Sequence, residues 1–300
     1  MTTLSRLLYI ILIIYILFGF LLYIKQRNIL YLPSSPIPTN FKEVYFDNNG
    51  TKIKTFVIHP KQEDAVIYFG GNAENVAYSV IAFEEKLKNH SLYFINYRGY
   101  GGSEGKPTEK GIYSDALFIY DQIKKHHKNI SIIGRSLGSG VATYLASKRP
   151  IKKLVLVTPF DSIRSVAQEI FPVYPMNILL KDKYDSVSRV FKITTKKILI
   201  IQGAKDKIVP PPHTQRLFDA FNKVPLSTVD RLYFEDRGHN DIDAEEQYYL
   251  KIKDFIETIK EEFHGCILRV PKINNSDPRV RSRMKRLIKK MTLDGKRLNL

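Results

Sequence analysis

The hydrophobic positions of the chain begin with one long uncharged run. Leu7 to Ile24 are 18 residues without a charged side chain, and as a helix they would span about 27 Å, close to the thickness of a bilayer core. A cleaved signal peptide or a buried core helix would be the competing interpretations. The run is longer than a usual signal region, no small-x-small cleavage site follows it, and it is apolar on all sides. We therefore expect a transmembrane anchor over residues 1–28.

After a proline-punctuated linker, short apolar strands alternate with helical segments. The expected strands are 43–46, 52–59, 65–69, 92–96, 130–134, 154–157, 197–201 and 231–234. The expected helices are 76–87, 112–125, 137–148, 212–221 and 245–259. Such alternation implies right-handed crossovers and a mostly parallel sheet covered by helices on both faces. The pattern predicts one α/β domain over residues 29–264.

One stretch of this domain, about 160–191, is less regular and rich in large apolar residues. We interpret it as a small lid insertion that could also form an acyl pocket. The competing interpretation is that these residues merely cover the sheet.

A glycine-flanked serine joins the expected strand 130–134 to the helix that follows. Gly134, Ser136 and Gly138 form the pattern G-x-S-x-G. In a nucleophile elbow the serine backbone is strained, and a side chain at either glycine would clash. The helix N-terminus would offer a backbone N–H and partial positive charge to an oxyanion. An ordinary glycine-rich turn fits the same pattern, so partner residues must decide.

A serine nucleophile needs a base, and the base needs a group that orients it. In open parallel sheets, ligands bind beyond the carboxyl ends of the strands. Asp206 follows the expected strand 197–201, and His239 follows the last expected strand. The order Ser136, Asp206, His239 is that of α/β-hydrolases. Asp206 could instead pair with a neighbouring lysine, whereas the six other histidines lie at less suitable places in the pattern.

An oxyanion hole needs two backbone donors. Leu137 follows the serine directly, so its N–H is one candidate. The loop Gly70-Gly71-Asn72 follows a strand, and its glycines allow close approach of the backbone to a substrate, which makes the Asn72 N–H the second candidate. A simple glycine-rich turn is the alternative for this loop.

The net charge of +17 is concentrated at the C-terminus. Residues 266–300 hold 11 Lys and Arg against 2 Asp and Glu, a net charge of +9, so we treat 265–300 as a basic tail. Val280, Met284, Leu287 and Met291 repeat at helical spacing, which predicts a basic amphipathic helix on anionic lipid or, equally well, a solvated tail. Nucleic-acid binding is disfavoured because no aromatic residue is interleaved with these charges.

Cysteine and histidine usage limits the possible chemistry. Cys266 is the only cysteine, so no intramolecular disulfide can form, which fits a reducing compartment. The histidines show no metal-binding spacing, and we expect neither a metal nor a cofactor.

The charges that flank the apolar run, Arg6 on one side and Lys25 and Arg27 on the other, are nearly balanced under the positive-inside rule. The cytoplasmic side is slightly favoured for the catalytic domain.

Five motifs resemble those of the α/β-hydrolase superfamily. They lie at 68–75, 96–105, 134–140, 202–210 and 238–241. Over roughly residues 30–262 the chain looks like the membrane-anchored single-domain serine hydrolases, a group that includes the ABHD-type depalmitoylases and bacterial relatives. The resemblance implies that Ser136, Asp206 and His239 form a catalytic triad, with Asn72 and Leu137 as oxyanion donors. Many relatives have His-Gly-Asn where this chain has Gly70-Gly71-Asn72, and the basic tail lies outside the family pattern.

The sequence therefore predicts a membrane-anchored serine hydrolase. It would cleave carboxylic esters or thioesters through an acyl-serine intermediate, with long-chain acyl groups as the preferred substrate hypothesis and membrane lipid as a partner. The alternative is a catalytically silent α/β-hydrolase scaffold at the membrane, because a fold can persist without its chemistry.

Overall fold

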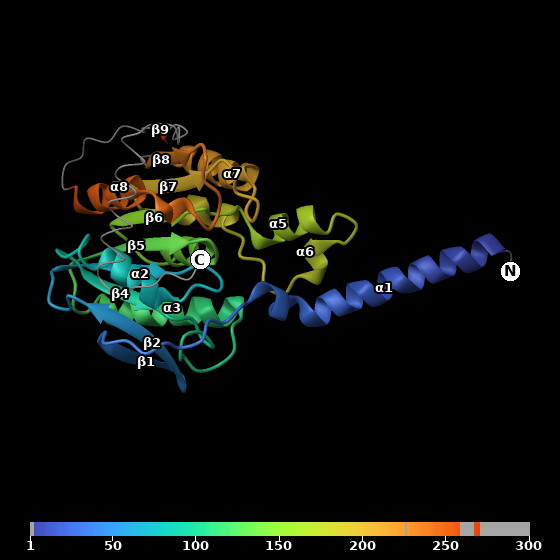
Figure 1. Cartoon of the computed structure of the whole chain (residues 1–300), viewed down its shortest axis with the longest axis horizontal. Helices are drawn as coiled ribbons and strands as arrows, with labels where there is room; N and C mark the ends of the chain where they lie inside the picture. The colour runs from blue at the N-terminus through green and yellow to red at the C-terminus, as the bar shows by residue number, and fades with distance from the viewer. Residues whose placement is uncertain (1–2, 226, 259–266, 271–300) are drawn as a thin grey trace, which may run out of the picture.

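The computed structural model describes residues 3–225, 227–258 and 267–270 of the 300-residue chain. Helix α1, Thr3–Leu30, projects from a layered body (Figure 1). It contains the apolar run, which is almost entirely exposed, Gly19 being its one buried residue. By length and composition α1 could cross a membrane, as the pattern predicts.

The body is built on a nine-stranded sheet whose order is β1-β2-β4-β3-β5-β6-β7-β8-β9. The strands are β1 (Glu43–Asn48), β2 (Thr51–Ile58), β3 (Asp64–Phe69), β4 (Ser91–Ile95), β5 (Asn129–Arg135), β6 (Lys153–Val157), β7 (Lys197–Gly203), β8 (Thr228–Phe234) and β9 (Ile267–Val270). The β1–β2 and β2–β4 pairs are antiparallel, and the remaining pairs are parallel. The predicted α/β fold with a mostly parallel sheet is confirmed.

Strand β9 lies in the segment that the sequence pattern assigns to the tail. It pairs parallel with β8, so the sheet continues past residue 264, where the pattern predicts the domain to end. Four residues followed by a basic stretch give too short an alternation to predict a strand. The amphipathic helix expected around 280–291, and Cys266, lie outside the described residues.

Helices cover both faces of the sheet, and each face has its own hydrophobic core (Figure 1). The helices of the body are α2 (Val76–Phe83), α3 (Glu109–Ile123), α4 (Leu137–Ala146), α7 (Pro211–Asn222) and α8 (Glu246–Glu257). α3, α4 and α7 contribute to the core on one face, and α2 and α8 contribute to the core on the other. The inner strands β6 and β7 are buried along almost their whole length and are mostly apolar, because both faces are covered.

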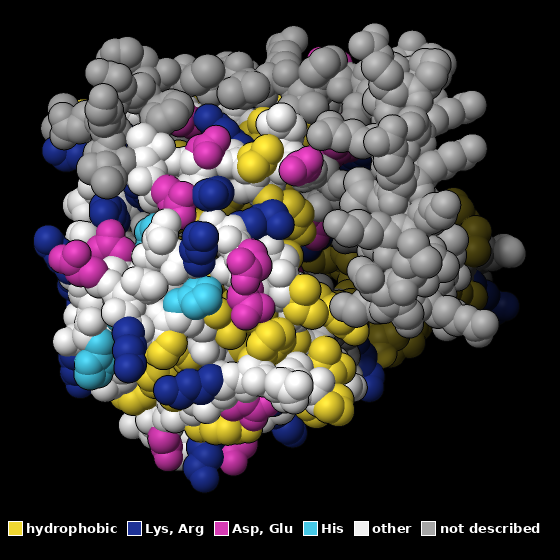
Figure 2. Space-filling model, turned by 60° about the vertical axis from the view of Figure 1, so that its left-hand side comes forward, with side chains coloured by type: hydrophobic (Ala, Val, Ile, Leu, Met, Phe, Trp, Pro, Cys, Tyr) yellow, Lys and Arg dark blue, Asp and Glu magenta, His cyan; other side chains and the backbone are white. Residues whose placement is uncertain are grey.

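The irregular stretch between β6 and β7 forms the α5–α6 segment, residues 163–180. It contains α5 (Ile163–Ile170) and α6 (Met176–Leu179), and a 3₁₀ helix, η1 (Val187–Lys192), follows. Figure 1 shows the segment beside α1, beyond the carboxyl ends of the strands. The α5–α6 segment thus occupies the edge where ligands bind in parallel sheets. On the side of the body turned away from α1, the space-filling view shows Lys, Arg, Asp and Glu side chains interspersed over the surface (Figure 2).

Candidate active site

The turn between β5 and α4 has the geometry of a nucleophile elbow. Ser136 has φ 50° and ψ −115°, a strained conformation for a residue other than glycine. A Cβ at Gly134 would collide with the carbonyl of Gly138, and a Cβ at Gly138 would collide with the carbonyl of Phe69. The Ser136 N–H donates to the Val157 carbonyl at 2.9 Å, which ties the turn to β6. Glycine is therefore required at both positions, because a side chain at either would clash with the backbone, as the G-x-S-x-G pattern predicts.

Ser136, His239 and Asp206 are joined by two hydrogen bonds. His239 Nε2 lies 2.8 Å from Ser136 Oγ, and His239 Nδ1 lies 2.7 Å from Asp206 Oδ2. An ionised carboxylate can only accept, so Nδ1 carries the proton and Nε2 is left to accept from the serine hydroxyl. Both His239 and Asp206 are buried. This arrangement lets the imidazole act as a base toward the serine.

The aspartate and histidine loops are fixed to each other by backbone hydrogen bonds. The Lys205 N–H donates to the Arg237 carbonyl at 2.9 Å, and the Ala204 N–H donates to the Phe234 carbonyl at 2.8 Å. The other carboxylate oxygen of Asp206 accepts from the N–H groups of Ile208 and Val209. These bonds hold the carboxylate in its loop, in place of the lysine pairing weighed as an alternative.

The Gly70-Gly71-Asn72 loop lies directly against the elbow. A Cβ on Gly71 would lie 3.6 Å from the Ser136 Cβ. Asn72 and Leu137 line the same cavity as Ser136, so the structure brings both oxyanion candidates to the serine. The Tyr100 hydroxyl donates to Asn72 Oδ1 at 2.8 Å, so the 96–105 loop braces the site.

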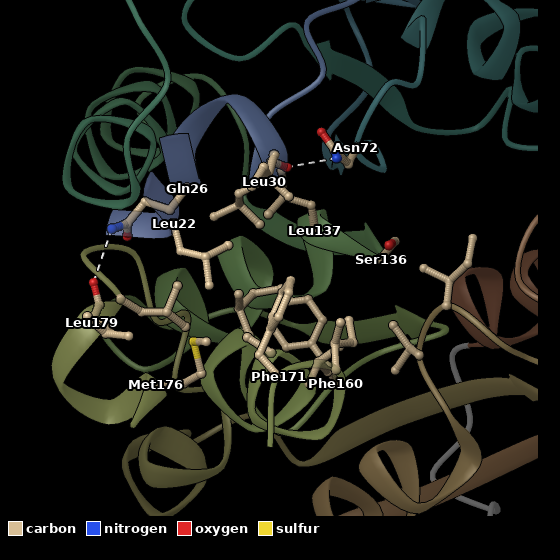
Figure 3. A pocket seen from close by; sticks show the side chains of 18 residues that line it. Leu22, Gln26, Leu30, Asn72, Ser136, Leu137, Phe160, Phe171, Met176 and Leu179 are labelled. Carbon is tan, nitrogen blue, oxygen red and sulfur yellow. Dashed lines mark hydrogen bonds between the residues drawn. The ribbon is translucent and has the colours of Figure 1, made fainter. Parts of the chain in front are cut away.

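Ser136 opens into an apolar cavity of about 280 Å³ (Figure 3). The rest of its lining is Leu22, Gln26, Ile29, Leu30, Asn72, Leu137, Phe160, Ile163, Val166, Ala167, Ile170, Phe171, Met176, Leu179, Leu180, Ile208 and Val209. These side chains come from α1, the oxyanion loop, the elbow, the α5–α6 segment and the Asp206 loop. The cavity can hold an apolar group next to the serine.

The end of α1 forms a wall of this cavity, which the sequence pattern does not predict. Leu22, Gln26 and Leu30 are spaced four residues apart, so they share one face of the helix. Gln26 is buried, and its amide donates to the Leu179 carbonyl at 3.0 Å and accepts from the Lys181 N–H at 2.6 Å (Figure 3 draws the first bond). The signal in the sequence was a glutamine with a leucine four residues away on either side. Such a residue gives an apolar helix face one side chain that can hydrogen-bond to the backbone of a neighbouring segment.

Another buried histidine, His213, lies between α7 and α5. His213 Nδ1 is 2.8 Å from Asp161 Oδ1, and His213 Nε2 is 2.9 Å from Glu169 Oε2 on α5. The Asp161 carboxylate also accepts from Arg216 Nε and from the Ser162 N–H. Burial raises the pKa of Asp161, but these hydrogen bonds outweigh it and hold the pKa below its ordinary value. The cluster ties α5 to α7.

Comparison with known proteins places this chain in a family. A family model described as the alpha/beta hydrolase fold matches residues 64–179. An uncharacterised membrane protein of Saccharomyces cerevisiae is 32% identical over 195 residues, which cover 62% of this chain and 68% of that protein. Human alpha/beta hydrolase domain-containing protein 17B is 30% identical over 172 residues, covering 56% of this chain and 57% of the human protein.

Solved structures agree on the fold. The esterase Pf2001 of Pyrococcus furiosus superposes with a TM-score of 0.61 at 17% identity, covering 75% of this chain and 96% of the esterase. The fold and the relatives define a class of hydrolases. The chain belongs to the α/β-hydrolase superfamily and resembles its ABHD-type members.

Proposed function

We propose that this protein is a membrane-anchored serine hydrolase that cleaves carboxylic esters or thioesters of long-chain acyl groups. The observation that carries the proposal is the hydrogen-bonded series Ser136–His239–Asp206 at the wall of an apolar cavity. A silent scaffold has no need for this alignment or for a strained serine.

In the proposed reaction, Ser136 Oγ forms a bond to the acyl carbon while His239 Nε2 takes the hydroxyl proton. Asp206 keeps the imidazole in the required tautomer and stabilises its protonated form. The developing oxyanion accepts from the N–H groups of Asn72 and Leu137, the second at the N-terminus of α4. The acyl–oxygen or acyl–sulfur bond then breaks, and the leaving alcohol or thiol takes the proton from His239.

Water completes the cycle. His239 removes a proton from a water molecule that attacks the acyl-serine carbon, and the proton returns to Ser136 Oγ as the acid leaves. The histidine therefore acts first as base, then as acid, and then again as base and acid in deacylation. All of these steps require Nε2 within reach of Oγ, the distance given above.

The cavity supports the choice of substrate. Apart from Gln26, Asn72 and Ser136, its lining consists of hydrophobic side chains, which suits an acyl chain better than a polar acid group. Two observations support membrane anchoring. The apolar run of α1 is long enough to cross a bilayer and is almost entirely exposed, and the yeast relative is named as a membrane protein. An anchor keeps such a site close to lipids and lipidated proteins.

The test is hydrolysis of an acyl series from acetyl to palmitoyl, prepared as oxoesters and as thioesters. Ser136→Ala is run in parallel, with Ser147→Ala at the end of the same helix as the matched control. We expect rates that increase with chain length, that vanish in Ser136→Ala and that persist in Ser147→Ala. Activity that survives in Ser136→Ala, or a short-chain optimum, would contradict the mechanism or the substrate class respectively.

A further inference from the structure

The turn between α5 and α6 is held against the middle of α1. The rings of Tyr15 and Tyr174 stack with centroids 4.6 Å apart and planes 4° from parallel. The Tyr174 hydroxyl donates to the Tyr15 carbonyl at 3.0 Å, and the Tyr15 hydroxyl donates to the Val173 carbonyl at 2.9 Å. A Cβ on Gly19 would lie only 3.0 Å from Tyr174 Cε1, so the missing side chain makes room for the ring. The contact is specific.

Two charged residues that directly follow this segment, Lys181 and Asp182, meet α1 nearer its C-terminal end. Lys181 Nζ lies 4.0 Å from the centre of the Tyr23 ring, and the Asp182 carboxylate pairs with Arg27 at 2.7 Å. The uncharged turn thus packs on the uncharged run of α1, and the charged residues that follow it meet the last turn of that run and the charged end of the helix. Two segments that enter a membrane side by side would show this alignment of their uncharged and charged parts.

The depth of the turn follows from the helix rise. Tyr15 lies nine residues before Ile24, the end of the uncharged run, which is about 14 Å along a helix axis. Half of a hydrocarbon core is about 15 Å. If α1 spans a bilayer, the turn lies well below the surface.

The surface of residues 170–180 is apolar apart from the exposed Asn177. Residues 170–180 include no charged side chain, and Ile170, Val173 and Ile178 are 63%, 69% and 74% exposed in the protein alone. Such a group of large exposed side chains marks a surface that contacts a partner or a membrane. Its continuity with the exposed apolar surface of α1 identifies the partner as lipid.

The backbone of the turn is also suited to hydrocarbon, where unpaired polar groups are costly. Pro172 and Pro175 have no N–H. The Gln168 side chain donates to the Phe171 and Pro172 carbonyls and accepts from the Met176 N–H. In water these three backbone groups could bond to solvent, whereas here one side chain pairs all of them.

The cavity extends from the oxyanion loop to the turn between α5 and α6. Its walls include Leu30 beside the oxyanion loop and Leu22 within the apolar run, eight residues or about 12 Å apart along α1. Ile170, Phe171 and Met176, from residues 170–180, line the same cavity. Ile170 therefore belongs both to the cavity lining and to the exposed apolar surface.

We infer that residues 170–180 insert into the acyl phase of the bilayer beside α1, and that acyl substrates enter the cavity sideways from the membrane. The inference rests on the proposed anchor and deepens the proposed function, because it assigns the substrate to the lipid phase. It commits to lipid as the covering partner, and a second protein chain is the competing outcome.

The chain has no tryptophan, so single tryptophans report on their surroundings without background. Ile178→Trp is placed in the full chain carrying Ser136→Ala and reconstituted in phosphatidylcholine vesicles, with and without bromination of the acyl chains. Leu12→Trp on α1 and Tyr45→Trp on β1 are controls, since both native side chains are 51% exposed. Because bromine quenches on contact, we expect quenching at 178 close to that at 12, and none at 45.

Other outcomes overturn the inference. An unquenched, solvent-like emission at 178 places the turn in water, and an unquenched, blue-shifted emission places it against protein. If position 12 is also unquenched, the anchor fails together with the inference. Because the measurement uses Ser136→Ala, none of these results depends on catalysis, and the proposed hydrolysis stands or fails separately.

A second experiment tests entry from the membrane. Ile178 does not line the cavity, so Ile178→Asp places a charge in the lipid phase without changing the site. We expect kcat/KM for a long-chain ester in vesicles to fall about 10-fold or more, with no change for a water-soluble butyrate ester. Ile178→Leu should preserve both rates. Equal losses on the two substrates, or none on either, would contradict entry from the bilayer.

Discussion

The side-chain amide of Asn72 donates a hydrogen bond of 2.8 Å to the carbonyl oxygen of Leu30, the last residue of α1 (Figure 3). Asn72 Oδ1 also accepts from the Leu32 N–H at 2.9 Å. One side chain therefore connects the N-terminal helix to the loop that we propose as part of the oxyanion hole. The position of α1 and the geometry of the site are coupled through this residue.

Asn72→Ala tests this coupling. The backbone N–H at position 72 remains, but its loop loses the bonds to Leu30 and Leu32, so we expect kcat to fall about 10- to 100-fold through misplacement of the donor. The control is Asn75→Ala, which also removes a hydrogen bond to the linker, to the Ser35 carbonyl, but lies outside the cavity. Steady-state kinetics on a long-chain ester compare the two. Equal rates would show that Asn72 only fastens the linker.

Gln26→Leu tests the contact between α1 and the α5–α6 segment. The variant keeps an apolar wall but loses the bonds to Leu179 and Lys181, so we expect KM for a long-chain ester to rise about 5- to 10-fold. The kcat for a short-chain ester should stay near the wild-type value. Lys25→Ala, an exposed position on the same turn, is the control. A loss of kcat on every substrate would argue against a role in acyl binding.

Gly19→Val tests the packing of Tyr174 on α1. The added side chain enters space that the ring occupies, at an overpacking cost of about 1–3 kcal/mol. The segment should open more often, and tryptic cleavage at Lys181 or Lys183 should accelerate about fivefold or more. Leu21→Val, an exposed position in the same helix, should leave the cleavage rate unchanged. Identical cleavage of both variants would show that this contact does not hold the segment.

The Asp161 cluster predicts a pH-dependent contribution to stability. The pKa of Asp161 is lowered in the folded protein, so the carboxylate stabilises the fold above its ordinary pKa of about 4. That contribution is lost as the pH falls through the lowered pKa. We expect Asp161→Asn to reduce the unfolding free energy by about 2 kcal/mol at pH 7. In denaturant melts in detergent, the difference from wild type should shrink below pH 4, and a constant difference would exclude this origin.

Much of the fold and the three residues joined by hydrogen bonds could be predicted from sequence. Gly134 and Gly138 impose a local steric requirement, and Asp206 and His239 follow strands whose carboxyl ends meet at one edge. The wall formed by α1 could not be predicted, because hydropathy identifies an apolar helix but not the surface it contacts. The same holds for His213: its partner Asp161 lies 52 residues away, and a histidine at a helix start carries no signal of it.

The central claim is that Ser136 becomes acylated. Wild-type protein in vesicles is mixed with a palmitoyl ester, stopped in acid within the first turnover and digested with trypsin, and the peptide that begins at Ser136 is measured by mass spectrometry. We predict a palmitoyl group on Ser136, absent from Ser136→Ala, which should neither be modified there nor hydrolyse the ester. Continued hydrolysis by Ser136→Ala, or turnover by wild type with this peptide always unmodified, would contradict the account.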